Sequence, residues 1–147
     1  MKKFLSLALV LTFSLILLSS CNFIKDTQAA DLMLKDFVSA LVNKDYEGAS
    51  AYIHPDVSIN ANDLKAMVED MEATWQMNLS SGVEYVELTQ MYTNYSATVI
   101  PKTEQTTYKI GYKVLIDGRK FDLNAVVFKS GDVMGIYTFK LTSGIGF

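Results

Sequence analysis

Two reactive side chains each occur once in this chain of 147 residues: the thiol of Cys21 and the imidazole of His54. A single cysteine cannot form a disulfide within the chain. One cysteine and one histidine also cannot complete a zinc site made only of these two residue types. The groups that remain for chemistry are therefore one soft nucleophile, one imidazole and the carboxylates.

Proton transfer by these groups has little support in the pattern. His54 precedes Pro55 in an expected surface loop, and Asp122 lies on the strand face opposite Phe121 and Leu123. No expected strand offers a clear pair of carboxylates for acid–base catalysis, and the chain has no nucleophile elbow, phosphate-binding glycine loop or metal-ligand spacing. We expect no catalytic residue, no metal site and no cofactor. A small isomerase- or hydrolase-like enzyme using a pocket carboxylate or His54 is the alternative.

The N-terminal residues give Cys21 a specific context. Lys2 and Lys3 precede an apolar run over residues 4–18, which as a helix would rise about 22 Å, short of the roughly 30 Å hydrocarbon core. A positive start, a short apolar stretch and small residues are typical of a secretory signal peptide. The sequence Leu18-Ser19-Ser20-Cys21 resembles the bacterial lipobox. This resemblance implies cleavage between Ser20 and Cys21 and attachment of a diacylglycerol group to the thiol.

The implied organisation is a signal peptide over residues 1–20, a lipidated tether over 21–30 and one domain over 31–147. Acyl chains contribute about 0.8 kcal/mol per buried CH₂, so two or three anchor a protein without a transmembrane helix. We expect an extracytoplasmic protein attached to the cell membrane or the outer membrane. Loss of Lys2 and Lys3 would change the formal charge from −3 to about −5. An acidic chain without a basic block argues against nucleic acid as a partner.

Three helices are expected before residue 80. Apolar residues recur every three or four positions from Asp31 to about Lys44, and a second helix is predicted over 46–53. A third follows Asn62, a candidate N-cap, and fades near Asn78. The first helix buries a stripe of apolar side chains: Leu34, Phe37, Val38, Leu41 and Val42.

From Gly82 onward the apolar period changes to two, which predicts strands over 83–92, 108–116, 121–127 and 133–141. Asp117-Gly118 is a strong hairpin signal, and Ser130-Gly131 indicates another turn. Residues 93–105 are ambiguous, with a candidate strand over 97–100 and a loop over 101–104. Helices followed by an antiparallel meander predict an α+β fold, with the N-terminal helices packed on one face of a curved sheet.

Short motifs add a resemblance to this pattern. The segments 37–41 (FVSAL) and 43–49 (NKDYEGA), followed by His54-Pro55-Asp56, resemble the opening of nuclear transport factor 2-like domains. The resemblance covers about residues 30–141 and implies a cone-shaped domain whose mouth can hold a ligand. Enzymatic members place an Asp, Glu or His on the pocket wall.

The expected strands present apolar side chains on two faces. One face would form either the packed core or a pocket for a small apolar ligand, with tyrosine hydroxyls near its mouth. The second face would be a homodimer or envelope-protein interface. The pocket residues are Tyr108, Tyr112, Phe121, Tyr137 and Phe139, and the interface residues are Val126, Phe128, Met134 and Ile136. These surfaces favour a non-catalytic lipoprotein that binds a ligand or partner, with a purely structural envelope component as a further alternative.

Overall fold

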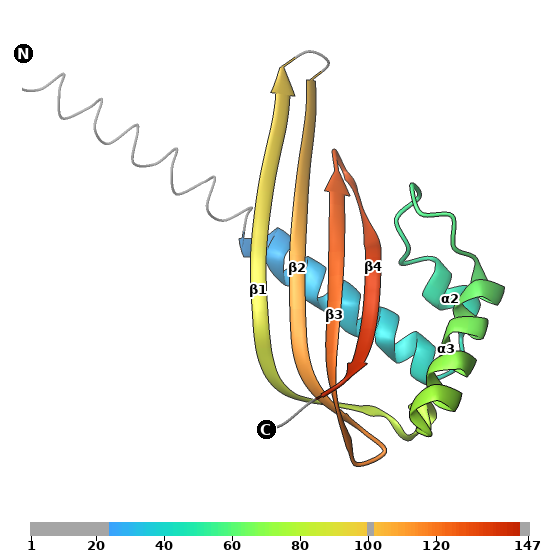
Figure 1. Cartoon of the computed structure of the whole chain (residues 1–147). Coiled ribbons are helices and arrows are strands. Elements are labelled where there is room, and N and C mark those ends of the chain that lie inside the picture. The colour runs from blue at the N-terminus through green and yellow to red at the C-terminus, as the bar shows by residue number, and fades with distance from the viewer. Residues whose placement is uncertain (1–23, 100–101, 145–147) are drawn as a thin grey trace, which may run out of the picture.

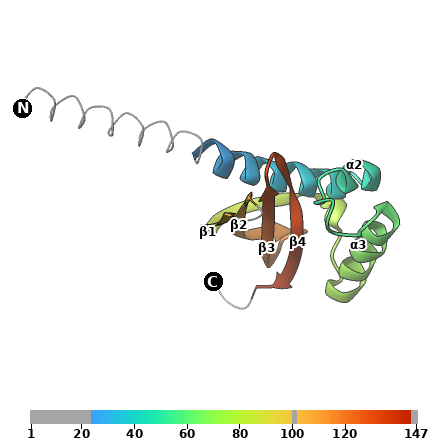
Figure 2. The ribbon, with the colours of Figure 1, turned by 90° about the horizontal axis from the view of Figure 1, so that it is seen from above.

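The computed structural model describes residues 24–99 and 102–144. Within these ranges, three α-helices precede a four-stranded antiparallel sheet, so the predicted α+β class is confirmed (Figure 1). A long N-terminal helix, residues 24–42, crosses one face of the sheet, and helix and sheet form two layers (Figure 2). The predicted signal peptide and Cys21 lie outside the described residues.

The chain is already helical at residue 24, the first residue that the structure describes, whereas the sequence predicted a helix start near Asp31. Residues 24–30 were expected in a tether, but they are helical, and Ala30 extends the buried stripe of the helix by one turn. The Lys129 ammonium donates to the Asp26 carboxylate at 2.6 Å, which fastens this first part of the helix to the sheet. The folded domain therefore includes most of the expected tether.

Helix α2 (Tyr46–Ser50) ends three residues earlier than predicted, because the chain then pairs with the sheet. The His54 N–H donates to the Ile136 carbonyl at 2.9 Å, and the Ile136 N–H donates to the Tyr52 carbonyl at 2.7 Å. This short parallel contact holds the loop after α2 against the last strand of the sheet.

Helix α3 (Ala61–Trp75) is capped by Asn60, so the prediction of Asn62 as N-cap is wrong. The Asn60 side chain accepts from the N–H groups of Asn62 and Asp63, and the Asp63 carboxylate accepts from the Asn60 N–H. This reciprocal arrangement is a capping box, which an Asn–Asp pair three residues apart can form. The helix ends at Gln76, whose backbone is left-handed (φ 48°). A short 3₁₀ helix, η1 (Leu79–Ser81), then leads into the sheet.

The sheet has the order β1-β2-β3-β4, a simple meander. Its strands are β1 (Val83–Val99), β2 (Lys102–Ile116), β3 (Arg119–Ser130) and β4 (Val133–Ser143). The predicted Asp117-Gly118 hairpin is confirmed, and both residues have the positive φ values, 53° and 71°, that a type I′ turn needs.

The predicted loop over 101–104 is not observed where the structure describes the chain, since Lys102 to Glu104 pair with β1. The paired ends of β1 and β2 project beyond the other strands (Figure 1). A projecting ribbon needs no buried face, which explains why the sequence there lacks clear apolar alternation.

Candidate functional site

The inner face of the sheet is packed against the N-terminal helix. Three of the predicted pocket residues, Tyr108, Tyr112 and Phe121, are 2%, 7% and 2% exposed. A fourth, Phe139, makes an edge-to-face contact with Phe37 of the helix, with ring centroids 5.2 Å apart. These four aromatic residues are therefore parts of the core between helix and sheet.

Tyr137 does not share that face, contrary to the prediction. The pairing of β3 with β4 shifts between Val126 and Val127, so Ala125 is opposite Phe139 whereas Val127 is opposite Ile136. The irregularity inserts an extra residue into β4 and reverses the alternation there. As a result Tyr137 is 47% exposed on the outer face, and Ile136, predicted for the outer interface, is 1% exposed in the core.

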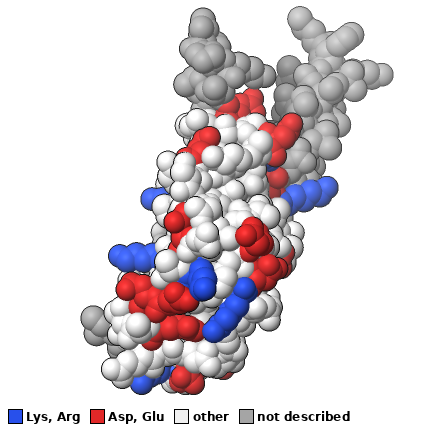
Figure 3. All heavy atoms as spheres, turned by 90° about the vertical axis from the view of Figure 1, so that its right-hand side faces the viewer, with Lys and Arg blue, Asp and Glu red and all other residues white. Residues whose placement is uncertain are grey.

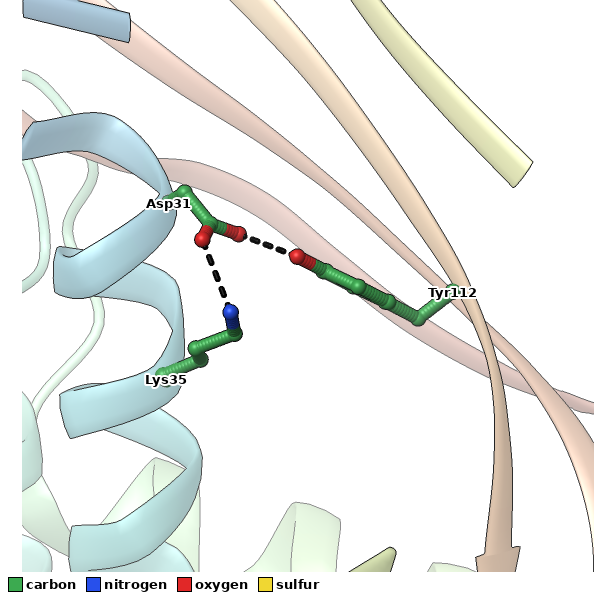
Figure 4. A network of polar contacts seen from close by, with 3 residues as sticks. All are labelled: Asp31, Lys35 and Tyr112. Atoms are coloured by element: carbon green, nitrogen blue, oxygen red, sulfur yellow. Dashed lines mark hydrogen bonds and ion pairs between the residues drawn. The ribbon is translucent and has the colours of Figure 1, made fainter. Parts of the chain in front are cut away.

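A polar cluster lies at the border of the core, between the N-terminal helix and β2 (Figure 4). The Tyr112 hydroxyl donates to the Asp31 carboxylate at 2.6 Å, and the Lys35 ammonium donates to the other Asp31 oxygen at 2.8 Å. Lys35 also lies over the rings of Tyr85 and Tyr112, 5.6 and 5.2 Å from their centroids. Asp31 thus joins two side chains that arrive from different elements.

Three groups of this cluster, Lys35, Tyr112 and Tyr85, have pKa values raised above their ordinary values. The hydrogen bond to Asp31 raises the pKa of Lys35, so its ammonium stays charged. Burial, followed by the bond to Asp31, raises the pKa of Tyr112. Burial also raises the pKa of Tyr85 to about 12. Through Asp31, the Tyr112 hydroxyl and the Lys35 ammonium join the N-terminal helix to β2.

The outer face carries an aromatic groove of about 380 Å³. Its lining comes from β2, β3, β4 and the loop after α2: Asp56, Gln105, Thr107, Val126, Phe128 and Tyr137. The rings of Phe128 and Tyr137 are 5.6 Å apart and form its apolar part. Asp56, whose side chain is 68% exposed, supplies a carboxylate at the rim. We call this surface the outer groove.

His54 supports the outer groove from beneath. It is 3% exposed, so its predicted surface position is wrong, and its ring contacts those of Phe128 and Tyr137 at 5.1 and 6.5 Å. Its Nδ1 accepts the Asp56 N–H at 3.2 Å, whereas Nε2 finds no hydrogen-bond partner among the described residues. In this position the His54 ring packs against the two aromatic rings of the outer groove.

The predicted outer interface is therefore divided. Val126 and Phe128 belong to the outer groove, whereas Met134 packs against the edge of the core and Ile136 lies inside it. The sequence reasoning missed Gln105, which falls in the ambiguous segment 93–105, and Thr107, which precedes the strand expected from residue 108. Their positions opposite Ser130 and Phe128 become visible only once the register of β2 and β3 is known.

Charges of both signs are interspersed over the side of the molecule that carries α2 and α3 (Figure 3). Among residues 24–99 and 102–144 there is no group of three or more His, Cys, Asp or Glu side chains placed to hold a metal ion. No helix of the same residues is long and apolar enough to cross a membrane.

Comparison with known proteins adds no assignment. The chain matches no protein-family model, and no curated protein sequence shows significant similarity to it.

Proposed function

We propose that this chain is a non-catalytic, lipid-anchored binding domain of the bacterial cell envelope, tethered through Cys21 and contacting a partner through the outer groove. The partner we favour is a protein or peptide that inserts an apolar side chain between Phe128 and Tyr137. A small apolar ligand in the same groove is the other outcome that the experiments below separate.

The outer groove is the observation that carries this proposal. Tyrosine is enriched among residues that dominate protein interfaces, because it offers a large apolar surface and a hydroxyl group. A half-exposed Tyr137 resting on Phe128 and a buried His54 has this character. The support of the rings from below reduces the conformational entropy that a partner must remove on binding.

The inner face also favours the outer groove over a pocket inside the sheet, because the N-terminal helix covers most of the inner face. The hollow of about 350 Å³ beside the start of that helix has a charged lining of Asp26, Glu104, Lys129 and Asp132 around Tyr95 and Tyr108. Leu34, Phe37 and Leu41 of the N-terminal helix are at most 1% exposed against the sheet. A small ligand is usually buried over 70–90% of its surface. Tyr112 and Phe139 are already in contact with Asp31 and Phe37 of the N-terminal helix, and Phe121 is in contact with Trp75 of α3.

Membership of the nuclear transport factor 2-like group is part of the proposal. It is supported by the order of helices before sheet, by the helix that lies across the curved sheet and by the α2 segment over residues 46–50 (Figure 1). Within this proposal the helix fills the space that would otherwise be the mouth of the cone.

A pair of alanine variants tests the groove. The processed protein is extracted from host membranes in mild detergent as the natural chain, as Tyr137→Ala and as Leu32→Ala. Leu32 is the control because it is a large apolar side chain, 59% exposed on the N-terminal helix, away from both the groove and β1. A bound protein seen by native mass spectrometry should dissociate in Tyr137→Ala and stay in Leu32→Ala. A bound lipid mass would identify the small-ligand outcome, and equal binding by both variants would refute the groove.

The anchor has an independent test. Cys21→Ser should leave the precursor uncleaved or release the protein from the membrane, because it removes the only thiol that can carry the lipid. Normal processing and membrane retention of Cys21→Ser would contradict lipidation.

A further inference from the structure

Strand β1 lies at the edge of the sheet, and within the described chain no strand pairs with its outer side. β1 is the longest strand, with 17 residues, and within the described chain it pairs only with β2. The opposite edge of such a strand presents a row of backbone N–H and C=O groups that can pair with another extended chain.

Protection of this edge is confined to the first half of the strand. Natural edge strands are shielded by bulges, charges or proline. In β1 the two register irregularities lie between Tyr85 and Gln90, and the two charged residues are Glu84 and Glu87. From Met91 to Val99 the pairing with β2 is regular, and the sequence has neither a charge nor a proline.

Exposed apolar side chains are concentrated on the same strand. Five of the ten large hydrophobic side chains exposed in the described chain belong to β1: Val86, Leu88, Met91, Tyr92 and Tyr95. Met91 and Tyr95 are opposite Ile110 and Thr106 of β2, so both lie on the inner face of the sheet, beside the core. They are 38% and 63% exposed, which is unusual for side chains of this size on the core side of a sheet.

We propose that two copies of this chain form a homodimer by antiparallel pairing of their β1 edges, with the two-fold axis near Thr93. Directly opposed residues of an antiparallel pair lie on the same face. A register centred on Thr93 therefore sets Met91 of each copy against Tyr95 of the other. A methionine beside an aromatic ring is a favourable contact.

Charge favours the antiparallel arrangement. Parallel, in-register pairing would place Glu84 and Glu87 of one copy beside the same residues of the other, and like charges directly opposite are destabilising. Antiparallel pairing about Thr93 places these carboxylates at opposite ends of the seam. It leaves the uncharged residues from Met91 to Ser96 at its centre.

The geometry supports a second copy as the partner, and this step rests on the proposed lipid anchor. A two-fold axis perpendicular to the sheet keeps both N-terminal helices on the same face of the joined sheet. Both helix starts, and hence both anchored ends, can then reach one membrane. Confinement to a membrane also raises the effective concentration of one copy around another.

Oxidative cross-linking in membranes tests the register. Opposed Cα atoms in antiparallel strands lie about 4.5–5.5 Å apart, within the range of a disulfide. Thr93→Cys should therefore cross-link to a dimer under mild oxidation. The matched control is Thr138→Cys, at an exposed position of β4, the other edge of the sheet, and we expect at least ten-fold less dimer from it. The natural chain, with Cys21 alone, gives the background.

Two further measurements keep the proposal falsifiable if a cysteine variant folds poorly. Native mass spectrometry of the detergent-extracted natural chain should show a dimer, and Tyr95→Lys should weaken it at least ten-fold by placing two lysines at the seam. A monomeric natural chain, or equal cross-linking through Thr93 and Thr138, would overturn the edge pairing. Cross-linking through Thr93 in a protein that is not membrane-bound would instead overturn only the anchor.

Discussion

Two neighbouring tyrosines give a matched test of what the polar cluster contributes to stability. The rings of Tyr85 and Tyr112 are 5.0 Å apart in an edge-to-face contact, but their hydroxyl groups differ. The Tyr112 hydroxyl donates to the Asp31 carboxylate at 2.6 Å, whereas the buried Tyr85 hydroxyl has no hydrogen-bond partner among the described residues. Replacing each tyrosine by phenylalanine removes a hydroxyl oxygen that is hydrogen-bonded to a carboxylate in one case and buried without a partner in the other.

The expected effects have opposite signs. A hydrogen bond to a charged group contributes about 1.5–3 kcal/mol, and the lower part of that range applies because Asp31 is partly exposed to water. Tyr112→Phe should therefore lower the free energy of unfolding by about 1.5 kcal/mol, or roughly 5 °C in Tm for a domain of this size. Tyr85→Phe removes a buried polar atom without a partner, so it should raise the free energy of unfolding by about 0.5–1 kcal/mol.

Urea unfolding at pH 7, followed by circular dichroism, measures both changes against the natural chain. The Asp31→Asn variant completes the comparison, because the loss caused by Tyr112→Phe should shrink when the charge on its acceptor is removed. Equal destabilisation by Tyr85→Phe and Tyr112→Phe would show that the two hydroxyl groups contribute alike, whether or not they are hydrogen-bonded. That result would refute the role assigned to the Asp31 bond.

Three other perturbations test separate parts of the structure. Gly135→Ala should cost about 2 kcal/mol or more in thermal unfolding, because its Cβ would lie 2.5 Å from the His54 Cα, and Gly144→Ala, whose nearest contact is 3.3 Å, should cost less. Asn60→Ala should cost about 1 kcal/mol through loss of the α3 cap, and an equally stable variant would contradict the capping box. Because burial raises the pKa of Tyr85 from 10.0 to about 12, the folded state binds this proton more tightly than the unfolded state. The stability that this proton contributes is fully present below pH 10 and is lost as the pH rises toward about 12. Unfolding measured between pH 10 and 12 should therefore show a smaller loss of stability in Tyr85→Phe than in the natural chain.

The sequence predicted the parts of this fold that depend on local rules. Apolar spacing identified the buried stripe of the N-terminal helix, and Asp117-Gly118 identified a type I′ hairpin, because each pattern carries its own physical cause. Alternation correctly assigned Tyr108, Tyr112 and Phe121 to the inner face, where the structure buries them. Whether these side chains line a pocket or belong to the core depends on where the helix lies. The alternation of residues along the strands does not predict the position of the helix.

The errors lie where a tertiary contact replaced the local pattern. The shift beside Val126 exchanged the faces of Ile136 and Tyr137, and strict alternation cannot anticipate an inserted residue. The segment from Tyr52 to His54 left the helical pattern because it pairs with β4, and this pairing buried an imidazole expected in water. The outer groove exists because of these two deviations, so sequence spacing alone could not locate it.

The two proposed surfaces are compatible, and their combination has a consequence for binding. The outer groove is lined by β2, β3 and β4, so pairing through the free edge of β1 leaves it uncovered. A two-fold axis perpendicular to the sheet would place both grooves on one face of the joined sheet, opposite the two N-terminal helices and therefore away from the anchored ends. Two equivalent grooves on one rigid sheet can bind a repetitive or dimeric partner with avidity. Tyr95→Lys should then weaken binding to such a partner while leaving the affinity of a single groove unchanged, whereas Tyr137→Ala should weaken both.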